Sequence, residues 1–161
     1  MKYIKTFENH SIINNQFWGT IGAGILPFSK KTDRFLLTLR SEFVKEPETW
    51  GTWGGKLDDM ETNDPREAAK IEFKEESDYS GKIKLIDAYI YKKKDDNGNV
   101  IFKYYNYIGI IDEEFEPVLD WETSDYKWLT VEELYNIEPK HFGLDALLKN
   151  SKEIIYKILK N

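Results

Sequence analysis

The sequence predicts a single α/β domain of the α+β type, and two observations lead to this prediction. Apolar segments with strand character recur along the chain between turns rich in Gly, Asp and Lys, and other segments carry clear helix signals. The length of 161 residues suits one hydrophobic core. We therefore assign residues 1–16 to an N-terminal arm and residues 17–161 to one domain.

Five segments are predicted strands because they are rich in β-branched, aromatic and other apolar residues and lie between turn residues. Residues 95–99 (DDNGN) are a strong turn signal, so the strands on either side should form a hairpin. An EF-hand loop is the alternative, but its glycine comes one position too early and no Glu follows at the required distance. Residues 41–60 should form a loop with one short strand. The five strands are 17–28, 34–40, 83–92, 100–111 and 125–129.

The first predicted helix is well marked at its start. Asp64 is a suitable N-cap, Pro65 suits the first helical position, and Glu67 completes a capping-box pattern. The helix is expected to cover residues 65–78 and to end at Ser80-Gly81.

Two more helices are predicted near the C-terminus. Residues 131–136 (VEELYN) should form a short one. Residues 144–159 are predicted to form one continuous helix, because Leu and Ile recur there at helical spacing. No repeat or linker divides the domain.

The composition excludes several function classes. A net charge of −6 argues against binding to nucleic acid or to an anionic membrane through a broad basic surface. With no Cys and only two His, disulfides and zinc catalysis are not expected, and a reducing cytoplasmic location is. Neither a signal peptide nor a membrane span is apparent. An acidic protein that handles anionic phosphates needs a local cation, and a divalent metal ion is the obvious one.

Three glutamates share one face of the first predicted helix. At about 100° per residue, Glu72, Glu75 and Glu76 fall within about 100° of arc. Clustered carboxylates repel one another unless a cation neutralises them, and oxygen ligands suit Mg2+ or Mn2+. A solvated acidic patch is the alternative for the helix alone. Ala68, Ala69 and Tyr79 share the glutamate face, whereas the opposite face carries Arg66, Glu67, Lys70, Lys74 and Ser77.

The loop before this helix strengthens the metal hypothesis. The run from Gly54-Gly55 to Glu61 brings a fourth acid close to the helix start. Because glycine lets a backbone approach a ligand closely, a loop carbonyl could join the glutamates as a ligand.

These residues resemble the Nudix hydrolases, whose signature is Gly, five residues, Glu, seven residues, and then Arg-Glu-apolar-x-Glu-Glu-x-Gly-apolar. The chain has Gly55, five residues and Glu61, followed after a spacer by residues 71–79 (IEFKEESDY). The likeness covers roughly residues 17–137. It departs from the signature at three points: the spacer has nine residues, Ile71 replaces the Arg, and Asp78 replaces the Gly. Arg66 or Lys56 would be a substitute for the missing cation.

The resemblance implies a fold, the Nudix α/β/α sandwich, in which a mixed sheet lies between the catalytic helix and the C-terminal helix. It also implies that Mg2+ (or Mn2+) is held by Glu72, Glu75, Glu76 and the carbonyl of Gly55. Glu61 would support these ligands from outside the metal's own shell.

The general base in such enzymes is one of the box glutamates, here Glu75 or Glu76, or an acid in a later loop. Glu122 is the later acid that we favour, ahead of Asp125 and Glu116, because it comes just before the predicted strand that contains Trp128. A plain surface acid is the alternative for Glu122.

Four residues are candidate substrate ligands, and each has an ordinary structural alternative. Arg40 ends a predicted strand before the box, and Lys56 follows the glycine pair. Trp53 is a candidate for stacking on a base, together with Trp50, Phe17 and Trp18, although a β-rich core uses such rings for packing. His141 lies at a turn into the last helix, where capping is the commoner role.

The predicted function is Mg2+-dependent hydrolysis of the diphosphate of a nucleoside diphosphate-linked substrate, with a nucleoside triphosphate, including an oxidised one such as 8-oxo-dGTP, as the first candidate. The alternative is a non-catalytic Nudix-like module that binds nucleotides, which the loss of the motif Arg motivates. The partner is thus a small nucleotide, without a membrane or nucleic acid. The resemblance allows a homodimer, but no interface can be located.

Overall fold

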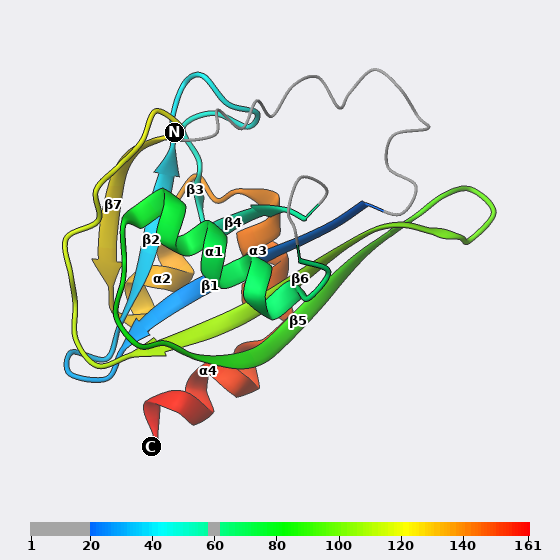
Figure 1. The fold of residues 1–161 in the computed structure, drawn as a ribbon. Helices are drawn as coiled ribbons and strands as arrows, with labels where there is room; N and C mark the ends of the chain where they lie inside the picture. Colours follow the sequence, from blue (N-terminus) through cyan, green and yellow to red (C-terminus); the bar gives the residue numbers. More distant parts are fainter. Residues whose placement is uncertain (1–19, 58–61) are drawn as a thin grey trace.

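The computed structural model describes residues 20–57 and 62–161 (Figure 1). The predicted N-terminal arm, Phe17, Trp18 and Glu61 therefore lie outside the described residues. Across the described ranges, no helix is both long and apolar enough to span a bilayer.

The centre of the fold is one mixed, seven-stranded sheet. Its order is β3-β2-β1-β6-β5, with β4 paired to β1 and β7 paired to β2. β1 and β6 run parallel, and every other pairing is antiparallel. Residues 41–60 contain two short strands where one was predicted. The strands are β1 (Thr20–Ser29), β2 (Arg34–Arg40), β3 (Trp50–Gly51), β4 (Trp53–Lys56), β5 (Lys84–Lys94), β6 (Val100–Ile111) and β7 (Thr123–Leu129).

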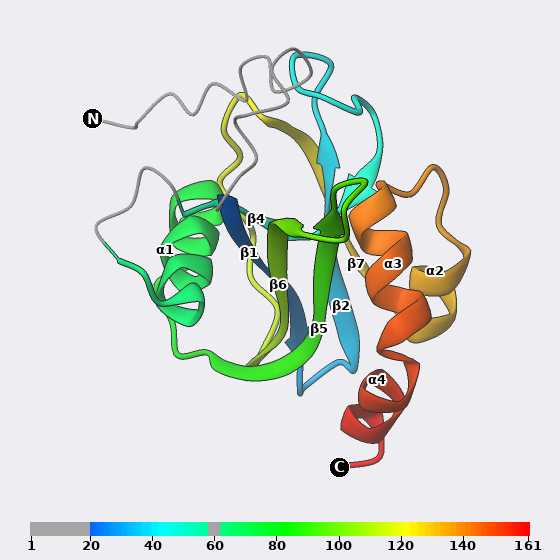
Figure 2. The ribbon, with the colours of Figure 1, turned by 90° about the vertical axis from the view of Figure 1, so that its right-hand side faces the viewer.

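Helices cover both faces of this sheet. α1 lies alone on one face, and α2, α3 and α4 lie on the other (Figure 2). The predicted α/β/α sandwich with a mixed sheet is therefore confirmed. The helices are α1 (Pro65–Ser77), α2 (Val131–Asn136), α3 (Phe142–Asn150) and α4 (Lys152–Leu159).

α1 begins where the sequence predicts and ends slightly earlier. The Asp64 carboxylate accepts a hydrogen bond from the Arg66 N–H at 2.9 Å, which is N-capping to the second helical residue. Glu67 instead lies 3.6 Å from Lys70. Asp78 ends the helix in the left-handed conformation, with φ 61°. That is the position where the Nudix signature has Gly, and Asp is among the residues that tolerate this conformation best.

The prediction of one continuous C-terminal helix was wrong. α3 stops at Asn150, and α4 starts at Lys152 after Ser151, whose φ of −122° and ψ of 18° are not helical. Asn150 and Ser151 both have low helix propensity, and the Asn150 side chain donates to the Ala146 carbonyl at 2.7 Å. The two helices still bury one common apolar face.

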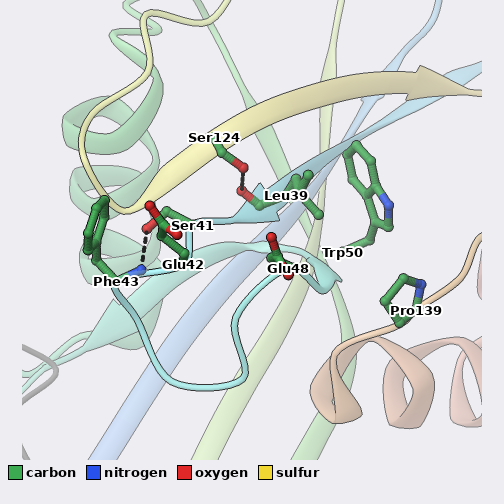
Figure 3. Close-up of a pocket in the computed structure, with 8 residues that line it drawn as sticks. All are labelled: Leu39, Ser41, Glu42, Phe43, Glu48, Trp50, Ser124 and Pro139. Atoms are coloured by element: carbon green, nitrogen blue, oxygen red, sulfur yellow. Dashed lines mark hydrogen bonds between the residues drawn. The ribbon is translucent and has the colours of Figure 1, made fainter.

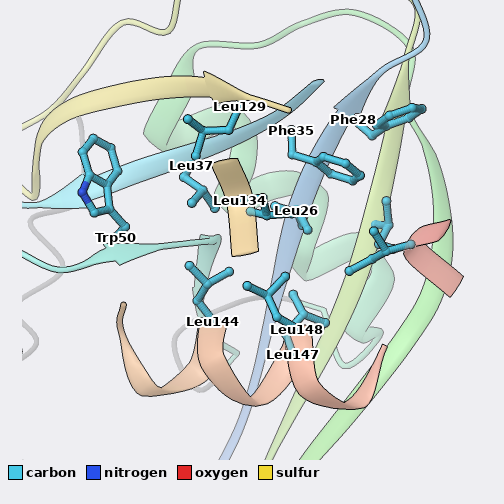
Figure 4. Packing of buried hydrophobic residues seen from close by; sticks show 12 residues of the cluster. Leu26, Phe28, Phe35, Leu37, Trp50, Leu129, Leu134, Leu144, Leu147 and Leu148 are labelled. Atoms are coloured by element: carbon cyan, nitrogen blue, oxygen red, sulfur yellow. The ribbon is translucent and has the colours of Figure 1, made fainter. Parts of the chain in front are cut away.

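Two hydrophobic layers hold the sandwich together, one on each face of the sheet. The layer under α3 and α4 includes Leu26 and Leu37 from the strands and Leu144 and Leu147 from α3, which point toward one another in Figure 4. The layer under α1 includes Ile25, Trp53 and Phe73. Because side chains alternate along a strand, β1 contributes to both layers.

Candidate functional site

Strand β4 separates the two faces of the candidate site. Gly54 faces the α3 side of the sheet, where a side chain at this position would collide with the Tyr104 hydroxyl. Gly55 faces α1, where a Cβ atom would come within 2.9 Å of the Glu72 carboxylate. The glycine pair thus brings bare backbone against a carboxylate on one side and a tyrosine on the other.

Two of the three glutamates predicted as metal ligands contact this strand. Glu72 is fully buried beside Gly55, and Glu76, only 9% exposed, accepts a hydrogen bond from the Gly54 N–H at 3.2 Å. Glu75 is exposed on the same helix. The helix turns the side that carries Ala69, Phe73 and Ser77 toward the sheet, which places Glu75 at the rim of the buried face. Ser77, predicted to lie on the opposite face, is therefore buried.

The register of β4 distinguishes the carbonyls of its two glycines. The Leu57 N–H donates to the Ile21 carbonyl, so Ile21 and Leu57 are a hydrogen-bonded pair of the antiparallel ladder. Such pairs recur every second residue, and Gly55 is opposite Ala23. The Gly55 carbonyl thus faces β1. The polar groups of Gly54 point to the free edge of β4, where Glu76 lies.

The residues present fit a hard divalent cation in their chemistry. Buried carboxylates are costly unless they are paired or coordinate a cation, and Glu72 and Glu76 supply oxygen ligands beside bare backbone. In the described ranges no three acidic or imidazole side chains are already gathered into a metal-binding cluster. The predicted set is Glu72, Glu75, Glu76 and the Gly55 carbonyl, but the register above turns the Gly55 carbonyl to β1 and makes the Gly54 carbonyl the better candidate.

Arg40 lies near both Glu76 and Glu122. Burial lowers the pKa of Arg40, and the carboxylates of Glu46, Glu76 and Glu122 act in the opposite direction. Arg40 is therefore close enough to Glu76 of α1 and to Glu122 for their charges to interact. Glu122 is 9% exposed, and its carbonyl accepts from the Ser41 N–H at 2.8 Å, which fixes it beside the end of β2. The other two acids considered, Asp125 and Glu116, are exposed.

A cavity of about 330 Å³ opens beside Gly54 on the α3 side of the sheet. Three of the four predicted substrate ligands line it: Arg40, Lys56 and His141. Lys45 and Lys93 add two further positive charges. Four aromatic side chains complete its walls: Tyr91, Phe102, Tyr104 and Phe142. A cavity with cations and flat rings suits an anionic ligand that carries an aromatic group.

Trp53, the fourth predicted substrate ligand, does not line this cavity. Its side chain is fully buried under α1, with its ring 5.8 Å from that of Phe73 in an edge-to-face arrangement. Trp50 is also buried and belongs to the layer under α3. The rings that line the cavity come from β5, β6 and the start of α3, where the sequence shows only ordinary strand and helix-entry patterns.

Tyr104 depends on glycines in two strands. Its ring lies over Gly22 and Gly24 of β1 and reaches Gly54 of β4, and a side chain at any of the three would collide with it. Burial, with a further contribution from Glu76, raises the pKa of Tyr104, so its hydroxyl stays protonated. Gly22 and Gly24 of β1 therefore make room for a buried tyrosine.

His141 both caps α3 and lines the cavity. Its Nδ1 accepts from the Gly143 N–H at 3.0 Å and caps α3. Its Nε2 lies 3.2 Å from a Glu46 carboxylate oxygen, as expected for a neutral ring that donates from Nε2. Burial, with a smaller contribution from Arg40, lowers the pKa of His141 to about 4. Hydrogen bonds between Trp50 and both Pro139 and His141 hold this segment against β3.

The position of the motif Arg is at the surface, because Ile71 is 40% exposed. Arg66, one proposed substitute, is engaged elsewhere: it lies 2.6 Å from Asp87 and stacks over the Tyr107 ring. Lys56, the other, lines the cavity. Arg40, whose charge interacts with that of Glu76, is a third cation that the sequence did not suggest for this role.

A second and larger hollow, about 530 Å³, lies next to Trp50 and Leu39 (Figure 3). Among the residues that the structure describes, Glu42 and Glu48 are its charged lining, and no Lys or Arg lines it. An acidic hollow repels phosphate, so we assign the candidate site to the smaller cavity.

Replacing Gly54 with alanine is expected to destabilise the protein by roughly 1–3 kcal/mol, because the added carbon overpacks the Tyr104 hydroxyl and the backbone of β1. Gly51→Ala is the matched control, since its new carbon would lie 3.6 Å from His141, an ordinary contact. Urea unfolding of both variants measures the difference. Equal losses would show that the Gly54 backbone has room.

Acidification is expected to destabilise the protein through His141. Its pKa of about 4 in the folded state lies below the ordinary 6.5, so the unfolded state binds more protons between these values. Stability should therefore fall as the pH drops from 6.5 to 4, by roughly 2–3 kcal/mol from this group. His141→Asn keeps a capping side chain without titrating. The variant should lose less stability over this window in thermal unfolding, and an identical loss would contradict the assignment.

The chain matches the NUDIX domain family model over residues 19–150. Among solved structures, it is similar to RenU, a Nudix hydrolase from M. smegmatis, with a TM-score of 0.71, 19% identity, and coverage of 88% of this chain and 87% of that one. A MutT NUDIX hydrolase from Burkholderia pseudomallei gives a TM-score of 0.60 at 21% identity, with 81% and 95% covered.

The NUDIX domain of Shewanella oneidensis NrtR, solved with ADP ribose, gives a TM-score of 0.61 at 18% identity, with 84% and 86% covered. A comparison with curated proteins finds no match. At these identities the solved structures show the fold, and the match to the family model shows the family.

Proposed function

The chain belongs to the NUDIX domain family of pyrophosphohydrolases, and from that membership we propose that it hydrolyses the diphosphate of a small nucleoside diphosphate-linked substrate with a divalent cation. One observation supports this most directly. Two buried glutamates of α1 meet the bare backbone of β4 at the edge of a cavity lined by cations and aromatic rings. Such an arrangement can hold a diphosphate between negative ligands for a cation and positive groups of the protein.

Glu72, Glu75, Glu76 and a β4 glycine carbonyl would hold the cation, which is Mg2+ or Mn2+ in this proposal. When bound, such an ion offsets charge on the diphosphate oxygens and makes a water molecule more acidic.

The remaining roles fall to the chain's own side chains. Glu122 or a box glutamate accepts a proton from the attacking water. The oxygen of that water forms a bond to one phosphorus while the bridging P–O bond breaks, and the departing phosphate takes the bonding electron pair. Arg40 donates to a phosphate oxygen and limits the build-up of negative charge. Lys56, at the cavity wall, binds a second phosphate group.

A nucleoside triphosphate, including an oxidised one such as 8-oxo-dGTP, is our first candidate substrate. The cavity volume of about 330 Å³ suits one ring system. ADP-ribose is an alternative, since a structurally similar NUDIX domain was solved with it.

The test is product analysis over a substrate panel. Nucleoside triphosphates, 8-oxo-dGTP, ADP-ribose and dinucleoside polyphosphates are incubated with Mg2+, Mn2+ or EDTA, and the products are separated by ion exchange. The proposal requires turnover of at least one member that EDTA abolishes, with nucleoside monophosphate among the products. Turnover that resists EDTA, or release of inorganic phosphate alone, would reject the proposed chemistry.

A nucleotide-binding module without catalysis is the second candidate, and the exposed Ile71 at the motif Arg position is the observation that favours it. Tight nucleotide binding without turnover on any substrate would support this candidate. Ile71→Arg would then be the variant in which turnover should appear.

A further inference from the structure

Asn106 is a buried amide in the wall of the cavity, and nothing in the reaction above uses it. It lies on β6, on the same face as Tyr104, and is only 5% exposed. Its side-chain NH2 group donates to the Tyr89 carbonyl at 3.2 Å and to the Tyr104 carbonyl at 3.5 Å. Because both partners are carbonyls, the nitrogen must point to them and the oxygen must point the other way.

The Asn106 amide oxygen receives no hydrogen bond from the described residues. An acceptor that is held in place in a cavity wall and left without a protein donor is a position that a ligand donor can fill. Asn106 lines the cavity, so a ligand in the cavity is the natural source of the missing donor. The Asn106 side-chain amide is held at an irregularity in the sheet. The register between β5 and β6 shifts between Asp87 and Tyr89, and Tyr89, whose carbonyl accepts from this amide, is the residue opposite Asn106.

The aromatic side chains around Asn106 offer faces for stacking. Phe142, at the start of α3, is 53% exposed, and its ring centre lies 5.9 Å from that of Tyr91. Tyr91 is 6.3 Å from Phe102, which is 6.3 Å from Tyr104. The Phe142 ring is thus accessible beside the cavity, and stacking on a base would bury it.

We propose that this cavity is a nucleobase subsite, in which the Asn106 amide oxygen accepts a hydrogen bond from an N–H on the edge of an amino purine and the Phe142 ring stacks on the base. The inference rests on the proposed function, because that function places a nucleotide beside β4. Adenine offers its 6-amino group, and guanine offers its 2-amino group and ring N–H. Purine riboside has no such donor and is the discriminating probe.

The experiment measures binding, so its result does not depend on turnover. The affinities of ADP, GDP and purine riboside 5′-diphosphate are determined by calorimetry with Mg2+ present. Wild type should bind the better of ADP and GDP about tenfold or more tightly than purine riboside diphosphate. Equal affinities for all three would overturn the proposal, and this comparison requires no variant to fold.

Two variants separate recognition from structure. Asn106→Leu should reduce the preference for the amino purine to about twofold or less, whereas a purely structural role would weaken all three ligands equally and keep the preference. Phe142→Ala should weaken all three by about tenfold and leave pyrophosphate binding unchanged. Phe43→Ala is its control, because Phe43 is 73% exposed in the other hollow. No effect of Phe142→Ala would overturn the stacking part.

The two proposals can fail separately. Hydrolysis without any preference for the amino purine would reject the subsite and leave the enzyme intact. Selective binding without hydrolysis would keep the subsite and reject the proposed reaction.

Discussion

Glu76→Gln should lower kcat by at least about 10²-fold, with little change in the stability of the metal-free protein. The glutamine keeps an oxygen that can accept the Gly54 N–H, so the contact between α1 and β4 survives. What it loses is the negative charge that we assign to cation binding and proton transfer. Steady-state kinetics on the best substrate of the panel measures the effect.

The matched control is Glu67→Gln, since Glu67 is exposed on the same helix and pairs only with Lys70 among the ion pairs found. A surface pair of this kind contributes little, so this variant should behave as wild type. A Glu67 variant that lost as much activity as the Glu76 variant would point to a general effect of helix charge.

Thermal unfolding gives a second readout that does not need substrate. At a hundred times its Kd, a bound cation stabilises the folded state by about 2.7 kcal/mol, which raises the Tm of a chain of this size by roughly 5–10 °C. Wild type should show this rise on addition of Mg2+ or Mn2+, and Glu76→Gln should lose most of it. No rise in wild type would mean that the glutamates do not hold the cation without substrate.

Arg40→Met should lower kcat/KM by about 10²-fold, because it removes the charged donor that we assign to a phosphate oxygen of the substrate. The kcat/KM of Arg40→Lys should lie between those of wild type and Arg40→Met. Lysine keeps the charge but lacks the planar guanidinium group that contacts two oxygens at once. The natural control is Arg34→Met at the opposite end of β2, where the ion pair that Arg34 makes within the described part of the chain is a long, 4.0 Å contact with Glu114.

Arg40 also has a structural role, which the measurement must separate. Its Nε and Nη2 atoms donate to the Lys45 carbonyl and close the 40–49 loop. Inhibition by pyrophosphate makes the separation: if Arg40 binds phosphate oxygens, Arg40→Met weakens pyrophosphate binding, and Arg40→Lys partly restores it. If both variants lower Tm and leave pyrophosphate binding unchanged, Arg40 serves only the loop.

Much of the fold followed from local patterns. The Asp64 cap, the 95–99 turn and the apolar run of residues 34–40 are signals that neighbouring residues create, and the structure confirms all three. The sequence pattern did not predict the helix break at Ser151, and the reason is equally local. Leu144 and Ile155 are eleven residues apart, which is close to three full helical turns, so the apolar stripe continues across the break.

The candidate site likewise contains residues that local patterns predict and residues that they do not predict. Glu72 and Glu76 could be found because helical spacing brings residues near in sequence to one face. The aromatic wall could not, because Tyr91, Phe102 and Phe142 come together only through strand pairing and the docking of α3. Trp53 was misassigned because composition does not say whether a ring faces a core or a cleft.

The parallel pairing of β1 with β6 also constrains how the protein folds. Thr20 pairs with Phe102 and Ser29 with Ile111, so the centre of the sheet joins segments that lie far apart in the chain. The β5–β6 hairpin and α1 can form early from local contacts, whereas the pairing of β1 with β6 must wait until β6 has been synthesised, and long-range pairing of this kind is slow. β6 also carries Tyr104 and Asn106 of the cavity wall, and Phe142 of α3 follows it in the chain. The cavity beside β4 is therefore completed late in synthesis, well after the glycines of β4 and the glutamates of α1 have been made.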